Sequence, residues 1–374
     1  MYDLQDEYRM HPYDAPSDIK LFLKSPQDYK RIRIDKNITA EDQRVTKAMN
    51  AGNEYDDYFC MTRDEFLKKY FIFAGTKPGP KIENIIEIIF EKCLSDFCNP
   101  ESLNYFGLPL EQMDLTHLKL EDILTELIIK EDYQANWKMP TRIQSVIDKG
   151  NKYFSQLTEC ADKTMIDMDT FNGLAETMEV LENDSIYGPT IQAIRHASKR
   201  PDWVEVIFQS EGYCDQFGIK GKRDIKIINH KAKTIRIIDI KTAQTPEMFK
   251  YNYFKYRYDI QGDMYATLEE MYMGNNIYTV LNPQFLVIFK DRSISPRFSM
   301  YEMTKEDRVV ARNGGNMGVV GYVEGWQPIL DEIHIMIANN DDFKQRLQYR
   351  KNGNLFRMED LFKTQIIYEY DNKR

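Results

Sequence analysis

The chain has 374 residues, 42% of them hydrophobic and 29% charged, and this length allows a large core arranged in two or three domains. No run of eighteen apolar residues occurs, which argues against a membrane-spanning helix. The net charge of −9 taken alone argues against a protein that binds the phosphate backbone of nucleic acid. The five cysteines are scattered and odd in number, which predicts a reducing, cytoplasmic location and no disulfide framework.

The first 200 residues are predicted to be mainly helical. Ser17 can cap a helix through IKLFLK, which Ser25-Pro26 would end, and a second helix is expected over about residues 41–60. A third helix is expected to begin near Thr62 with RDEFLKKYF, and longer helical patterns follow the loop AGTKPGPK. The apolar residues of these helices recur at three- and four-residue spacing, which indicates core packing.

After Pro201 the pattern changes to strands. WVEVIFQ, GIKGKRDIKII and TIRIIDIKT alternate as strands do, and the last two are joined by a turn at residues 229–232. A helix carrying YDIQGDMYA follows, and then two further strands, QFLVIFK and PRFSMYEM. From Lys305 the chain is expected to be helical around a glycine-rich turn.

This order predicts an α/β (α+β) fold with a central mixed β-sheet flanked by helices. We expect a helical N-terminal region at 1–200 that contributes the helix at about 41–60 to the site, a core at 201–303, and a helical extension at 304–374.

Positive charge is concentrated in one window of the chain. Between Gly218 and Ile260 there are eleven Lys or Arg and four Asp or Glu, a net +7 within a chain of net charge −9. Such a strip suits a protein that holds a polyanion at one surface, although lysines that solubilise a strand edge are the alternative. The candidates for contact with a phosphate backbone are Lys220, Lys222, Arg223, Lys255 and Arg257, the last two lying among the tyrosines of YNYFKYRY.

Three spaced motifs in this window carry the chemistry: Gly221-x-x-Asp224, Asp239-x-Lys241 and Gln261-x-x-x-Tyr265. Strand alternation places Asp239 and Lys241 on one face, and Asp224 on the neighbouring strand can reach the same pocket. Two carboxylates can hold Mg²⁺ or Mn²⁺, and a nearby lysine can orient water or neutralise developing charge. The alternative is a strand that ends with both groups in solvent.

Together these motifs resemble the PD-(D/E)XK nuclease superfamily, specifically its RecB-like and RecE-like phage exonuclease branch. The resemblance implies that Asp224, Asp239 and the backbone carbonyl of Ile240 bind Mg²⁺, with Mn²⁺ as a substitute, and that Lys241 serves the attacking water. It also implies that Gln261 acts near the DNA backbone or the lysine. Tyr265 either contacts DNA or packs in the core.

The N-terminal segments SDIKLFLKSPQDYK and AMNAGNEYDDYF resemble RecE-type nucleases as well. Asp56 takes the place of a histidine common in that family, and this makes it a further candidate metal ligand. Helical spacing places Asp56 on an apolar stripe with Gly52 and Phe59, and Gly52 would let another backbone come close. A stripe through Tyr55 and Tyr58 would instead leave Asp56 solvated, and Glu54 and Asp57 are the neighbouring candidates.

The activity that the resemblance implies is a metal-dependent deoxyribonuclease that digests linear double-stranded DNA from 5′ to 3′ in phage recombination or replication. The remaining 3′ strand would pass to a single-strand annealing protein. Family members form homo-oligomeric rings, and a phage protein would act in the host cytoplasm. The alternatives are a PD-(D/E)XK endonuclease or DNA-end-processing nuclease, and a non-catalytic DNA-binding protein that retains the fold.

Overall fold

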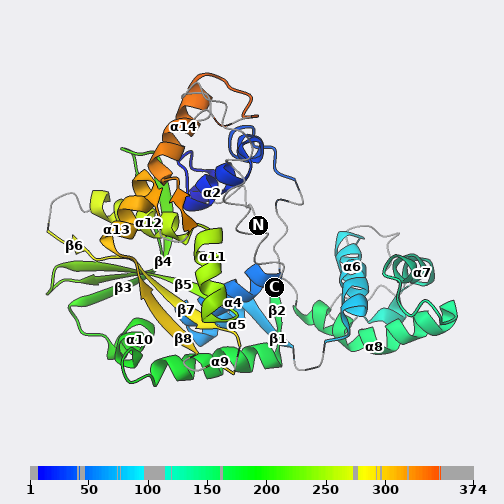
Figure 1. Ribbon diagram of the computed structural model, residues 1–374. Coiled ribbons are helices and arrows are strands. Elements are labelled where there is room, and N and C mark those ends of the chain that lie inside the picture. The colour runs from blue at the N-terminus through cyan, green and yellow to red at the C-terminus, as the bar shows by residue number, and fades with distance from the viewer. Residues whose placement is uncertain are drawn as a thin grey trace. The chain divides into compact units, whose positions relative to one another are not determined.

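The computed structural model describes residues 7–346 except 40–41, 43–46, 74, 76, 97–113, 119, 161–162, 273–276, 292, 295–296, 318–319 and 345 (Figure 1). The chain forms two compact units. One combines the residues up to Cys60 with those from Val180 onward, and the other runs from Met61 to Glu179. We call them the sheet unit and the helical unit.

The helical unit is built on three helices that share one apolar core, which contains Ile85, Leu124 and Phe154. Its elements are α5 (Arg63–Lys69), β1 (Tyr70–Phe73), α6 (Pro80–Asp96), a 3₁₀ turn (Leu115–His117), α7 (Glu121–Lys130), α8 (Met139–Cys160), β2 (Thr164–Asp167) and most of α9 (Met168–Glu182).

One expectation for this region was wrong. The helix that starts after Thr62 ends at Lys69, and YFIF forms strand β1, which pairs in parallel with β2. Aromatic and β-branched residues favour a strand once a partner is present, and no periodicity within RDEFLKKYF reveals that partner about ninety residues later.

The sheet unit contains a mixed sheet in the order β3–β4–β5–β7–β8, with β6 paired to the start of β5. Its strands are β3 (Val204–Cys214), β4 (Ile219–Asn229), β5 (Thr234–Ala243), β6 (Thr279–Val280), β7 (Gln284–Phe289) and β8 (Phe298–Glu302). The β3–β4, β4–β5 and β7–β8 pairs are antiparallel, whereas β5 and β7 are parallel. The parallel pair requires a crossover between β5 and β7, and helices supply it.

Helices cover both faces of this sheet, and α12 and α10 lie on opposite sides of it (Figure 1). The helices and short elements are α1 (Glu7–Met10), α2 (Pro16–Lys24), α3 (Pro26–Tyr29), a π-helical turn (Lys30–Ile34), α4 (Lys47–Cys60), α10 (Gly188–Arg195), a 3₁₀ turn (Ala197–Lys199), α11 (Pro246–Lys255), α12 (Tyr258–Tyr272), α13 (Lys305–Asn313), β9 (Gly315–Asn316), β10 (Tyr322–Val323) and α14 (Trp326–Ala338). The main core joins α2, α12 and α14 to the sheet through Ile19, Ile237, Met264 and Trp326, all almost completely buried.

Helix α12 is the central support of the unit, and it buries three acids. Asp263 accepts hydrogen bonds from Arg308, Arg312 and the indole of Trp326, at 2.8–3.0 Å. Asp259 pairs with Arg257, and Glu269 pairs with Arg223 and Lys226. Buried charges are tolerated when they are paired in this way, so α12 is fixed to the strands on one side and to α13 and α14 on the other.

The expected fold class, a mixed sheet flanked by helices, is confirmed. The helices α2 and α4 lie within the first 200 residues, yet they belong to the sheet unit and contact its core. Of the helical extension expected at 304–374, α13 and α14 are present, and residues 347–374 lie outside the described part. Among the described residues, no helix combines the length and the apolar character needed to cross a membrane.

Candidate active site

Asp239 and Lys241 lie on the same face of β5, as the alternation predicted. Asp239 is 2% exposed, and its Oδ2 forms an ion pair with Nζ of Lys241. Burial disfavours the ammonium of Lys241, but the charges of Asp239 and Asp224 outweigh this and raise its pKa above the usual value. The lysine is therefore held charged beside a buried carboxylate.

Gln261 of α12 fixes the other oxygen of Asp239. Its Nε2 donates to Oδ1 of Asp239 at 2.9 Å and to the hydroxyl of Tyr265 at 3.1 Å. Tyr265 is 6% exposed and packs beneath Gly221, where a Cβ would lie 2.9 Å from its ring. Lys241 and Gln261 thus hold the two carboxylate oxygens of Asp239. Tyr265 is buried in the core, where it accepts the hydrogen bond of Gln261, so its position matches the packing alternative and not a DNA contact.

Asp224 joins this group from β4. Its Oδ2 accepts a hydrogen bond of 2.7 Å from the backbone N–H of Ile240, the residue between Asp239 and Lys241. Burial, followed by the charges of Asp239 and Asp56, raises the pKa of Asp224 well above its usual value. The backbone carbonyl of Ile240 accepts a hydrogen bond of 3.4 Å from Nζ of Lys241. The predicted metal ligands, which are the carboxylates of Asp224 and Asp239 and this carbonyl, therefore gather around one short stretch of β5.

The pairing of β4 with β3 is interrupted at Asp224, between the pairs Phe208–Ile225 and Ser210–Arg223. Arg223 and Lys226, three residues apart on β4, both reach Glu269 on the α12 face, which an undisturbed alternation of period two would not allow. Opposite Asp224, Gln209 of β3 has a φ of +51°, a conformation that is costly for a residue other than glycine. Strain at this point accompanies the turning of the Asp224 side chain toward Asp239.

Asp56 reaches the same group from α4. Its Oδ2 accepts a hydrogen bond of 2.9 Å from Nε2 of Gln209, and its Oδ1 accepts a weak one of 3.5 Å from the thiol of Cys60. Burial raises the pKa of Asp56 to about 6, with a smaller contribution from the charges of Asp57 and Asp239. The interpretation that leaves Asp56 solvated is therefore wrong.

Gly52 does not play the role expected of it. A Cβ at this position would meet, among the described residues, only the Thr242 hydroxyl oxygen, at 3.9 Å, so no backbone in that part of the chain approaches it closely.

Lys20 of α2 is a member of the site that the sequence did not reveal. Its Nζ donates to Oε1 of Gln261 at 3.3 Å and lies 5.2 Å from the centre of the Tyr258 ring, which also has Lys241 5.0 Å away. Burial, with a further contribution from Lys241, lowers the pKa of Lys20 to about 7. No spacing or periodicity in the sequence singles out Lys20 or Gln209, because each joins the site through tertiary contacts.

The predicted phosphate contacts divide into two groups. Lys220 is 2% exposed and donates to the carbonyls of Tyr8, Arg9 and His11, so it is a structural residue of the N-terminal segment.

Arg223 and Arg257 are likewise occupied by Glu269 and Asp259, and the assignment of Lys220, Arg223 and Arg257 to DNA contact is corrected for that reason. Lys222, weakly paired with Glu211, and Lys255, between the rings of Tyr251 and Tyr256, face solvent and stay candidates.

The site offers oxygen donors of the kind that Mg²⁺ prefers: the carboxylates of Asp224 and Asp239 and the carbonyl of Ile240, with Asp56 adjacent. Within the described residues, no three His, Cys, Asp or Glu side chains are close enough to hold an ion on their own. The acids are nevertheless near enough to raise one another's pKa, and a bound cation would relieve that repulsion. The chemistry of the donors therefore fits a divalent cation that retains water as additional ligands.

Comparison with known proteins adds little. No protein-family model matches the chain, and no curated protein matches it. Among solved structures, a protein from Eubacterium rectale described as a "Putative exonuclease" aligns over 91% of this chain and 88% of its own, with a TM-score of 0.40 and 11% identity. A similarity of that size has no bearing on function.

Proposed function

We propose that this protein is a metal-dependent nuclease that hydrolyses phosphodiester bonds of DNA at the group formed by Asp56, Asp224, Asp239, Lys241 and Gln261. The observation that supports this most strongly is the position of Asp239, whose carboxylate is held between the ammonium of Lys241 and the amide of Gln261. Asp224 accepts a hydrogen bond from the backbone N–H of Ile240, the residue between Asp239 and Lys241. A buried carboxylate pair beside a charged lysine suits phosphoryl chemistry better than it suits packing.

In this proposal Asp224, Asp239 and the carbonyl of Ile240 hold Mg²⁺, or Mn²⁺ in its place, which when bound supplies Lewis-acid stabilisation of negative charge on the phosphate. Lys241 orients the attacking water and offsets the charge that develops on the phosphate oxygens. Gln261 keeps Asp239 in a fixed rotamer, and Asp56 lies where it can complete the ligand set or accept a proton from water.

The finer proposal is a RecE-like exonuclease that digests linear double-stranded DNA from 5′ to 3′ in phage recombination or replication. It follows from the resemblance of the three motifs. An annealing protein for the 3′ strand, a homo-oligomeric ring and a location in the bacterial cytoplasm belong to the same proposal.

Digestion of linear and covalently closed duplex DNA of the same sequence tests the mode of cleavage. With Mg²⁺ present, we expect loss of the linear form only, with a 5′ end label released before a 3′ label. Preparations of Lys241→Gln, made in parallel, control for contaminating nuclease. Nicking of the closed circle would favour the endonuclease, and binding without cleavage would favour the non-catalytic protein.

A further inference from the structure

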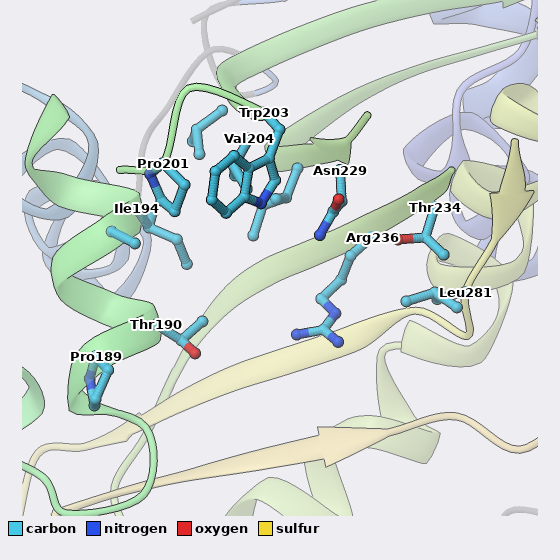
Figure 2. A pocket seen from close by; sticks show the side chains of 13 residues that line it. Pro189, Thr190, Ile194, Pro201, Trp203, Val204, Asn229, Thr234, Arg236 and Leu281 are labelled. Carbon is cyan, nitrogen blue, oxygen red and sulfur yellow. The ribbon is translucent and has the colours of Figure 1, made fainter. Parts of the chain in front are cut away.

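A pocket of about 380 Å³ lies on the face of the sheet that α10 covers, and none of the acids of the site lines it. It is lined by one side of α10 and by the ends of β3, β4 and β5 that lie near the β4–β5 turn (Figure 2). Arg236 and its partner Ile227 in the β4–β5 register both line it. Because Arg236 is an odd number of residues from Asp239 on β5, the two side chains point to opposite faces.

The polar part of this pocket is suited to an anion. Figure 2 shows the guanidinium of Arg236 extending into the space between Thr190 and Asn229. Within the described part of the chain the guanidinium has no carboxylate or other hydrogen-bond partner, and no Asp or Glu lines the pocket. The planar donors of a guanidinium without a carboxylate partner match a phosphate.

The rest of the pocket is suited to a flat, apolar group. Trp203 is 47% exposed at the rim, with Nζ of Lys231 5.1 Å from its ring, and Ile194, Val206 and Leu281 form apolar walls. Asp202, between the lining residues Pro201 and Trp203, is exposed and does not line the pocket. Glu205 alternates to the other face of β3 and pairs with His230. An anion site next to an exposed indole and an additional lysine combines the two elements that bind single nucleic-acid strands.

We propose that this pocket binds one nucleotide unit of a single nucleic-acid strand, with the phosphate at Arg236 and the base against Trp203. This inference rests on the proposed function for the nature of the ligand, and it adds a second contact on the face of the sheet that carries α4 and α10. Thr190 and Asn229 supply further hydrogen-bonding groups beside the phosphate, and the volume is that of a site for a small ligand.

The test uses the full chain and a fluorescein-labelled oligothymidylate in EDTA, so that no cleavage occurs during the binding measurement. The variants are Arg236→Gln and Trp203→Ala. Their matched controls are Lys233→Gln, in the β4–β5 turn three residues before Arg236 but outside the pocket, and Trp137→Ala, the other exposed tryptophan at 44% exposure. Thermal unfolding of each variant shows whether it is folded.

We expect each pocket variant to bind the oligonucleotide about tenfold more weakly, with the controls within about twofold of wild type. Loss of one phosphate contact should also reduce the slope of log K against log salt by about 0.7 for Arg236→Gln, and not for Trp203→Ala. Folded pocket variants that bind like wild type would overturn the inference. Binding of dTMP as tight as that of the oligonucleotide would overturn it too, because the ligand would then be a free nucleotide.

Digestion of linear duplex by the same preparations separates this inference from the proposed function. If wild type digests DNA and the pocket variants bind oligonucleotide normally, only the pocket inference fails. If wild type digests nothing and the pocket variants lose binding, the pocket inference is supported and the nuclease proposal fails.

Discussion

Lys20 donates to Gln261, Lys241 pairs with Asp239, and both lie near the ring of Tyr258, yet their environments have opposite effects on their pKa values. Asp239 and Asp224 raise the pKa of Lys241, whereas burial and the charge of Lys241 lower that of Lys20 to about 7. The two lysines thus differ in how firmly they hold the proton, because the pKa of Lys241 is raised and that of Lys20 is lowered. The separation gives the site one permanent positive charge and one that depends on pH.

The lowered pKa of Lys20 predicts a specific pH dependence of stability. Below pH 7 the lysine is charged in both folded and unfolded chains, and its burial then destabilises the fold in full. Between pH 7 and its ordinary value of 10.5 the folded chain has lost the proton that the unfolded chain keeps, so stability rises with pH. Lys20→Met should remove this rise, which is on the order of 5 kcal/mol across the interval.

Urea unfolding at several pH values, followed by tryptophan fluorescence, measures this effect. Lys24→Met is the matched control, because Lys24 is an exposed lysine of the same helix α2. If both variants kept the pH dependence of wild type, the lowered pKa of Lys20 would be contradicted.

At the scale of elements, the site depends on how closely α12 approaches β4. A Cβ at Gly221 would lie 2.6 Å from Leu268 and 2.9 Å from the ring of Tyr265, so only glycine permits this spacing. Tyr265 accepts a hydrogen bond from Gln261, which in turn holds Asp239. The glycine of the G-x-x-D motif therefore acts on the site through helix packing, and its role is distinct from that of Asp224.

Two glycine-to-alanine substitutions should have opposite effects. Gly221→Ala forces Tyr265 and Leu268 aside and is expected to lower the free energy of unfolding by about 1–3 kcal/mol, with a loss of activity. Gly52→Ala, on α4, meets only Thr242 at 3.9 Å and should raise it by up to about 1 kcal/mol through better helix propensity. Chemical denaturation of both variants provides the measurement. A stable, active Gly221→Ala would mean that α12 can shift without disturbing Gln261.

At the scale of the whole molecule, the sequence was most informative where function and local pattern coincide. Strands β3, β4, β5, β7 and β8, the β4–β5 turn and helix α12 could be predicted because residue periodicity and turn residues mark them. The contact of Asp239 with Lys241 followed from a spacing of two on one strand, and the position of Gln261 beside them was implied by the family resemblance.

Charge along the sequence was a poor guide to charge on the surface. Lys220, Arg223 and Lys226 contribute to the net +7 of the basic window, but all three are buried with partners of their own. Their partners are backbone carbonyls of the N-terminal segment and Glu269, which are not adjacent in sequence. The same window contains the arginines Arg223, Arg236 and Arg257, and among the described residues only Arg236 has no ion-pair or hydrogen-bond partner. The folded structure shows this, and the sequence does not.

Mg²⁺-dependent release of nucleotides from a linear duplex, by wild type beside Asp239→Asn and Lys241→Gln, tests the central claim most directly. Wild type should digest the DNA, chelation should stop it, and each variant should lose at least a hundredfold in rate while remaining folded. Lys24→Gln, which changes an exposed lysine remote from the acids in sequence, should digest at the wild-type rate. Wild-type rates in the two site variants, or no digestion by wild type with either Mg²⁺ or Mn²⁺, would contradict the proposal that this group of residues hydrolyses DNA.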